Sequence, residues 1–218
     1  MTGSSEMEGQ RDLWGQVEAA VESKLKELAE VNSHLRRKIF DLHAIFEITR
    51  QLNSILELEQ LLDAILLVAT EQAGCENGAL VVEDFNAELS FWRSRGFTQE
   101  KVWPALAKSG HLVEIFLRKK RAVSVSELEQ ILPSGSEEIV LLKNSGIELC
   151  LPLTSREKVL GILFLTGRVS QEKYQPADLE FLSSLVNNLA VTVENARLYQ
   201  SIKTAHEQVH KTQLQLAE

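Results

Sequence analysis

The sequence predicts an α+β fold in which a sheet, covered on both faces, is flanked by long helices. The run from Val159 to Leu165 carries apolar residues on both faces of a strand, which indicates burial on both sides. From Ala177 to Glu218 the chain has no glycine or proline and repeats apolar residues at helical spacing. Residues 13–56 show a similar repeat and contain one glycine, Gly15, and no proline.

Composition limits the classes to which the protein can belong. It has 218 residues, of which 44% are hydrophobic and 25% charged, as expected for one domain with extensions. A net charge of −8 argues against binding to a nucleic-acid backbone. Two cysteines favour a reducing compartment, and the sequence has neither a signal peptide nor an apolar run long enough to span a membrane. We therefore expect a soluble, cytoplasmic protein without nucleic-acid or membrane partners.

The first long helix is predicted to form a coiled coil. With Trp14 at heptad position d, most d and a positions up to Phe46 are apolar. Asn32 falls at an a position, where a second asparagine would satisfy it in a parallel, in-register homodimer. The alternative is a single amphipathic helix packed on its own domain, with Asn32 exposed. Residues 1–12 are expected to be disordered. The predicted seam within residues 13–44 consists of Trp14, Val21, Leu25, Leu28, Asn32, Leu35, Ile39 and Leu42.

Between the long helices, short elements alternate with turn residues. Residues 58–73 are predicted to form an amphipathic helix with Gly74 as its C-cap. Alternation along the strand at 159–165 places Val159, Leu163 and Leu165 on one face and Leu160, Ile162 and Phe164 on the other. The other expected elements are strands at 79–82, 89–93, 122–125 and 147–153, short helices at 99–108, 111–119 and 137–143, and an acidic, solvated loop with Glu127, Glu129, Glu137 and Glu138.

The closing helix is predicted to begin at Pro176 and to carry two apolar stripes. The first stripe should cover the core, and the second should meet a partner helix. The first consists of Leu179, Leu182, Val186, Leu189, Val193 and Ala196. The second consists of Leu198, Ile202, Ala205, Val209, Thr212 and Leu216, of which we assign Leu198, Ile202 and Val209 to dimerisation.

Two segments resemble the GAF domain family of sensory modules. Leu151-Pro152-Leu153 followed by Val159-Leu160-Gly161-Ile162-Leu163 is similar to the central hairpin of the family, and Glu194-Asn195-Ala196-Arg197-Leu198 to its closing helix. The resemblance implies an antiparallel sheet of about five or six strands, with terminal helices on one face and short helices and loops over a pocket on the other. It covers residues 45–199, which leaves residues 200–218 as a C-terminal coiled-coil or signalling helix.

The resemblance further implies a dimeric sensory module that binds a small molecule non-covalently. Its terminal helices would transmit the state to an output domain, such as a histidine kinase, a cyclase or a transcription activator, in a longer protein. One alternative is a GAF-like dimerisation spacer without a ligand, and another is a small redox enzyme of the same fold.

On this resemblance, a ligand is expected beneath the segment that covers the sheet, and the expected ligand-binding residues are Trp92, Phe97, Trp103, His111 and Phe116. Each aromatic residue could instead be ordinary core. His111 would be the ligand of a haem if one binds, and otherwise caps its helix. The ligand itself is not identified by the sequence.

Other cofactors and catalytic groups are disfavoured. The Asn-Lys and Asp-Glu pairs of the cyclic-nucleotide branch are absent, and neither Cys75 nor Cys150 precedes the histidine common at bilin attachment sites. Both thiols are interpreted as buried and structural. His206 and His210 share a helix face but have no third ligand, so no metal site is predicted. No catalytic triad or phosphate-binding loop is found, and we expect no enzymatic activity.

Overall fold

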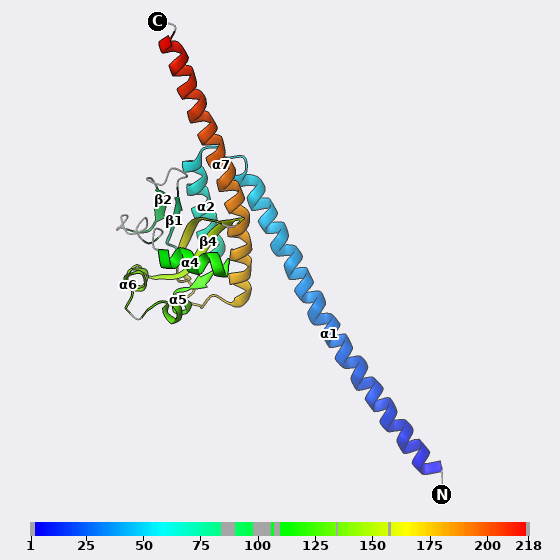
Figure 1. The fold of residues 1–218 in the computed structure, drawn as a ribbon. Coiled ribbons are helices and arrows are strands. Elements are labelled where there is room, and N and C mark those ends of the chain that lie inside the picture. The colour runs from blue at the N-terminus through cyan, green and yellow to red at the C-terminus, as the bar shows by residue number, and fades with distance from the viewer. Residues whose placement is uncertain are drawn as a thin grey trace. The chain divides into compact units, whose positions relative to one another are not determined.

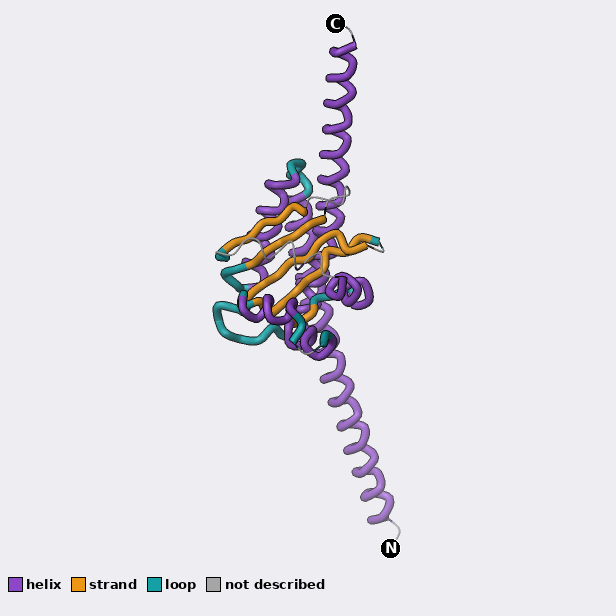
Figure 2. The backbone as a smooth tube through the Cα atoms, turned by 60° about the vertical axis from the view of Figure 1, so that its left-hand side comes forward, coloured by secondary structure: helices purple, strands orange, loops and turns teal. Residues whose placement is uncertain are grey.

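A five-stranded antiparallel sheet forms the centre of the domain (Figures 1 and 2). The computed structural model describes residues 3–83, 90–97, 106, 110–133, 135–156 and 158–216. All neighbouring strands within this part of the chain pair antiparallel, which confirms the predicted α+β class. The strands in spatial order are β2 (Ser90–Arg95), β1 (Gly78–Glu83), β5 (Lys158–Thr166), β4 (Ile147–Ser155) and β3 (Val123–Ser124).

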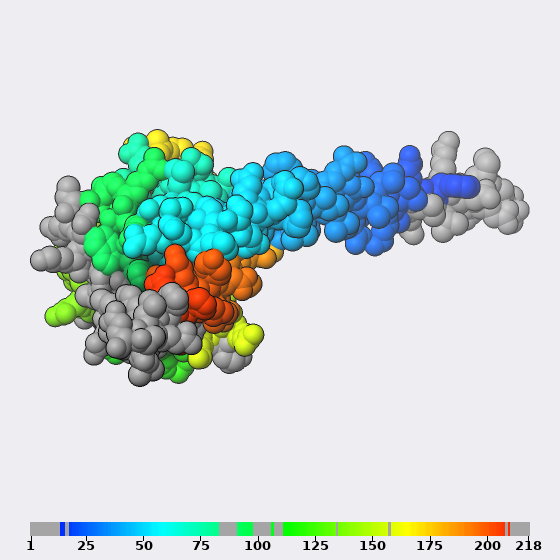
Figure 3. Space-filling view, turned by 90° about the horizontal axis from the view of Figure 1, so that it is seen from above, coloured from blue at the N-terminus to red at the C-terminus, as the bar shows by residue number. Residues whose placement is uncertain are grey.

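Two layers of helices cover the two faces of this sheet (Figure 1). On one face, α2 (Leu58–Ala73) and α7 (Pro176–Leu216) share an apolar cluster with Leu163 and Leu165. Figure 3 shows the atoms of α2, in cyan, next to those of α7, in orange to red. On the other face, α4 (Gly110–Lys119), α5 (Val125–Ile131) and α6 (Glu137–Asn144) share a second cluster with Ile162 and Phe164. Each face of β5 is therefore buried, as its sequence predicts.

The first helix, α1, extends over Gly3–Leu52, and the chain divides into two compact units between Ala44 and Ile45. Ile45 and Leu52 belong to the core of the second unit. The helix begins within the segment that was expected to be disordered. That segment is polar but contains no proline, so nothing in its sequence breaks a helix.

Both core helices of the second unit have the expected terminal residues. Gly74 adopts φ +69 at the C-terminus of α2, which confirms the predicted left-handed cap. Pro176 begins α7, and Asp178 Oδ2 accepts a hydrogen bond of 2.7 Å from the backbone N–H of Gln175.

Alternation along β5 is interrupted by a β-bulge. Leu153 pairs with Gly161 and Thr154 pairs with Val159, so Leu160 is the extra residue of the bulge. Leu160 consequently packs in the cluster on the α2–α7 face, and Val159 packs against the other. The predicted faces of Val159 and Leu160 were wrong, because one extra residue inverts the alternation before it.

The acidic segment after β3 forms helix α5 instead of the predicted loop. Ser124 Oγ accepts a hydrogen bond of 3.1 Å from the backbone N–H of Glu127 and so caps the helix. This cap also ends β3 after two residues, within the strand predicted at 122–125. Glu137 and Glu138 lie in α6, which agrees with the helix predicted at 137–143.

Candidate functional site

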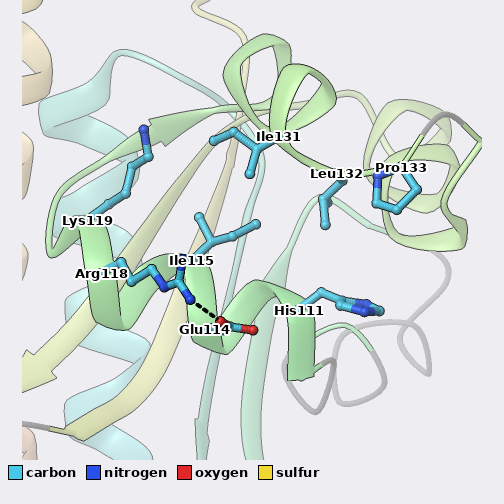
Figure 4. Close-up of a pocket in the computed structure, with 8 residues that line it drawn as sticks. All are labelled: His111, Glu114, Ile115, Arg118, Lys119, Ile131, Leu132 and Pro133. Carbon is cyan, nitrogen blue, oxygen red and sulfur yellow. Dashed lines mark hydrogen bonds and ion pairs between the residues drawn. The ribbon is translucent and has the colours of Figure 1, made fainter.

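A groove between α4 and the residues after α5 is the candidate ligand site. Its volume is about 350 Å³. Figure 4 shows Ile115 of α4 and Ile131 and Leu132 pointing toward one another, with His111 and Lys119 near opposite ends. The floor is therefore apolar and the charged groups lie at the rim. The residues that line the groove are His111, Glu114, Ile115, Arg118, Lys119, Ile131, Leu132 and Pro133.

Helix α4 presents one face to the core and another to the groove. Leu112 and Phe116, four residues apart, are fully buried in the cluster above the sheet. His111, Ile115 and Arg118 are spaced by four and three residues, so they share a different face of the helix. Burial of Leu112 and Phe116 thus fixes which side chains of α4 face the groove.

Arg118 and Lys119 lie at one end of the groove with Glu114, and Lys119 also contacts Glu127 just beyond the lining residues. Arg118 forms an exposed ion pair of 2.5 Å with Glu114, one turn earlier in α4. Lys119 Nζ and Arg121 Nη2 each lie 2.6 Å from Glu127 Oε1. Hydrogen bonds from Arg121, and then from Lys119, hold the pKa of Glu127 below its ordinary value of 4.5. This end of the groove therefore has more basic groups than carboxylates.

His111 lies near the other end of the groove, beside α6. Its Nδ1 is 3.3 Å from Glu138 Oε1, and the imidazole is 69% exposed. Because this imidazole is largely exposed and already contacts Glu138, we assign no haem chemistry to it.

The other expected ligand residues lie apart from the groove. Phe116 is fully buried beneath α4, while Trp92 and Phe97 are half-buried against the same cluster. The prediction for Trp103 lies outside the described residues. Of the four expected ligand residues that the structure describes, His111 alone lines the groove.

The two cysteines are free and lie on opposite faces of the sheet. Cys75 packs in the α2–α7 cluster and Cys150 in the α4–α6 cluster. Burial raises the pKa of both thiols, so the reactive thiolate is disfavoured at each. This placement gives no support to the redox-enzyme alternative.

Metal-ligating residues do not gather anywhere in the described part of the chain. No group of three or more His, Cys, Asp or Glu residues there could hold a metal ion. The described helices also include none that is both long and apolar enough to cross a bilayer.

Both long helices carry exposed apolar side chains at the predicted seam positions. In the first unit, every apolar residue predicted for the seam is more than half exposed, and Asn32 is exposed as well. In α7, Leu198 is 50%, Ile202 69% and Val209 57% exposed. Val191, seven residues before Leu198, is also 51% exposed, which places it on the same outer stripe.

Sequence reasoning missed most of the groove. Ile115, Ile131 and Leu132 are ordinary apolar residues in sequence, and only the packing of α4 beside the end of α5 brings them together. The run of four basic residues at 118–121 was the available signal for the charged rim.

An antiparallel sheet with long helices on one face and a layer of short helices on the other defines an α+β domain. The chain belongs to the GAF domain family, whose model matches residues 57–193, more than half of the protein. This family includes sensory domains that bind small molecules or bilins, and its members are generally regulatory rather than catalytic. No protein of curated function matches the chain.

Several solved structures share this fold at low sequence identity. The GAF domain from a phosphoenolpyruvate-protein phosphotransferase of Coxiella burnetii covers 74% of this chain and 96% of its own, with a TM-score of 0.53 and 18% identity. The phycocyanobilin-bound GAF domain from a cyanobacterial phytochrome covers 72% and 96%, with a TM-score of 0.52 and 15% identity. Residues 122 to 287 of a methyl-accepting chemotaxis protein cover 69% and 97%, with a TM-score of 0.50 and 12% identity. At these identities the likeness concerns the fold alone.

Proposed function

We propose that this protein is a homodimeric sensory module that binds a small molecule non-covalently in the α4–α5 groove. It transmits the bound state along α7 to an output domain, such as a histidine kinase, a cyclase or a transcription activator, in a longer protein. One observation carries this proposal. The single helix α7 packs on the sheet through a buried stripe and bears an exposed apolar stripe for a partner.

The two stripes of α7 overlap along the helix. Val193 and Ala196 are buried against the core, whereas Val191 and Leu198 point away from it and are half exposed. A rotation or shift of the sheet-packed face must therefore move the outer face as well. Such coupling through one rigid element is the physical basis of the proposed transmission.

A second copy of the chain is the proposed partner of these stripes. Exposed leucine, isoleucine and valine at heptad spacing favour association with another helix, because apolar area is then removed from water. Val21, Leu25 and Leu28 also line an apolar hollow along α1 with Ala20 and Lys24. Asn32 selects the parallel, in-register arrangement of this pair.

Disulfide cross-linking tests the module. In a background with Cys75→Ser and Cys150→Ser, Ile202→Cys and Val209→Cys should each cross-link two protomers. Thr204→Cys and Glu207→Cys are matched controls, because both residues are exposed but lie off the stripe. Cross-linking at Ile202 and Val209 should exceed that at the controls and should change when a ligand binds. Equal cross-linking at all four positions would rule out the seam and the output path.

A dimerisation spacer that has lost its ligand is the second candidate function. It is favoured by the interior between the short helices and the sheet, which is filled by Phe116, Phe164, Leu112 and other buried apolar side chains. In that case the α7 cross-links would form, but no small molecule would change them or raise the melting temperature.

A further inference from the structure

The rim of the groove is connected to α7 by a short chain of polar contacts. Lys119, at the rim, donates a hydrogen bond of 2.6 Å to Glu127 at the start of α5. Arg121 donates to the same carboxylate, at 2.6 and 3.1 Å, and to the backbone carbonyl of Ala122 at 2.8 Å. The N–H of Ala122 in turn donates to Ser183 Oγ of α7 at 2.8 Å. Arg121 and Ala122 thus link the groove to α7.

Ala122 lies where the two helix layers meet. Its side chain is buried in the cluster of α2 and α7, while the next residue, Val123, is buried in the cluster beneath α4. Any displacement of Arg121 therefore acts on a residue that is packed and hydrogen-bonded against α7.

The charges at the rim favour an anionic group at this end of the groove. The Arg118–Glu114 pair is exposed on both sides, and such pairs are weak, so an anion can compete with Glu114 at little cost. Glu127 has two basic partners, and Arg121 still neutralises it when Lys119 leaves. Arg118 and Lys119 can both turn to one incoming carboxylate without leaving a buried charge unpaired.

The apolar floor determines the rest of the ligand. Ile115, Ile131 and Leu132 form the middle of the groove, and Pro133 lies beyond them (Figure 4). From His111 to Lys119 the helix rises by about 12 Å, so the groove is long enough for a short hydrocarbon chain.

We propose that the groove binds a small amphipathic carboxylate, which competes with Glu127 for Lys119. Release of Lys119 shifts the contacts of Arg121 and Ala122, and so changes the hydrogen bond to Ser183 of α7. This inference rests on the sensory function proposed above. It names the class of ligand for the same groove and the route from the groove to α7.

Octanoate is a suitable probe, and octanamide has the same chain without the charge. Calorimetric titration of the full chain should show octanoate binding at least about tenfold more tightly than octanamide. Arg118→Gln and Lys119→Gln should each weaken the binding of octanoate about fivefold to tenfold and leave the binding of octanamide unchanged. Lys143→Gln is the matched control, because this lysine pairs with Glu129 outside the groove, and it should change neither.

Hydrogen exchange at the Ala122 amide tests the route to α7. Octanoate should change its exchange rate, and Lys119→Gln without ligand should already show the rate of the bound wild type. Ser183→Ala should bind octanoate normally, but its Ala122 amide should exchange quickly with or without ligand.

The proposed ligand class would be overturned if octanamide bound as tightly as octanoate. It would also be overturned if the substitutions of Arg118 and Lys119 left octanoate binding unchanged. Binding without any change at Ala122 would overturn the route. If octanoate does not bind while the α7 cross-links form, the inference fails and the sensory module stands. If the cross-links are absent while octanoate still changes Ala122, the dimeric output path fails instead.

Discussion

Gly161 of β5 lies close against the backbone of β1. A Cβ atom at this residue would be 2.3 Å from the carbonyl oxygen of Val81, far inside van der Waals contact. The oxygen belongs to the backbone of a central strand, so it cannot move away without loss of sheet pairing. Glycine is therefore required by the strand spacing, not by the backbone torsion of the residue.

Gly161→Ala should lower the free energy of unfolding by about 2–3 kcal/mol, because the added methyl group overpacks the sheet. Urea denaturation measures this loss. Gly15→Ala is the control, since nothing lies within 4 Å of the added carbon in α1. It should be neutral or stabilising by up to about 1 kcal/mol through helix propensity. Similar losses in both variants would contradict the close-approach argument.

Glu127 should contribute stability that depends on pH. Its pKa is lowered in the folded protein, so its contribution is fully present above about pH 4.5 and is lost as the pH falls through the folded pKa. Glu127→Gln should reduce the free energy of unfolding by about 1 kcal/mol at pH 7 and by much less near pH 3. Thermal unfolding across this range measures the difference.

Glu129→Gln provides the comparison for Glu127. Glu129 forms an ion pair with Lys143 in which both side chains are about half exposed, so its loss should have little effect at any pH. A gap between wild type and Glu127→Gln that stayed constant down to pH 3 would be evidence against the ion-pair explanation.

At the scale of elements, the β4–β5 hairpin is hydrogen-bonded to α7 through side chains. Thr154 Oγ1 donates to Asn187 Oδ1 at 2.8 Å, and Ser155 Oγ donates to Glu194 Oε2 at 2.6 Å. Asn187 and Glu194 are seven residues apart and share one side of the helix. These bonds fix the register of α7 on the sheet, in addition to its buried apolar stripe.

A double-mutant cycle measures one of these bonds. Ser155→Ala and Glu194→Ala should show a coupling energy of about 1 kcal/mol in the free energy of unfolding, because the hydrogen bond is partly buried and charge-assisted. The cycle with Arg118→Ala and Glu114→Ala is the reference, and its exposed pair should couple by only about 0.3–0.5 kcal/mol. Equal coupling in the two cycles would mean that the hairpin contact is not a specific restraint.

At the scale of the whole molecule, the proposed dimer depends on seams in both units. Asn32→Leu should raise the melting temperature of α1 and broaden the distribution of oligomers. An asparagine buried in the dimer seam lowers stability but specifies the register and the number of helices, and leucine does the opposite. Ser33→Leu is the matched control at the adjacent, off-seam position. Analytical ultracentrifugation with thermal unfolding measures both effects. A wild-type protein that remained monomeric at roughly 10 µM would contradict the dimer.

The sequence alone predicted the features that depend on local spacing. Gly74 marks the end of α2 because a left-handed cap requires no distant partner. The strands at 147–153 and 159–165 and the helix from Pro176 were also predicted from local sequence, because their apolar periodicities reflect a buried face. The predictions of two covered faces and of the GAF family followed from these elements and their order.

Tertiary structure decided what depends on residues far apart in the chain. The bulge at Leu160 arises from pairing with β4, and it inverts an alternation that the strand alone suggests. The groove exists because α4 turns Leu112 and Phe116 into the core and leaves Ile115 opposite Leu132. Likewise, Arg121 reaches α7 through Ala122 and Ser183, a contact across 61 residues that no local pattern encodes. Spacing along a chain specifies which face a residue occupies, whereas its neighbours across that face are set only by packing.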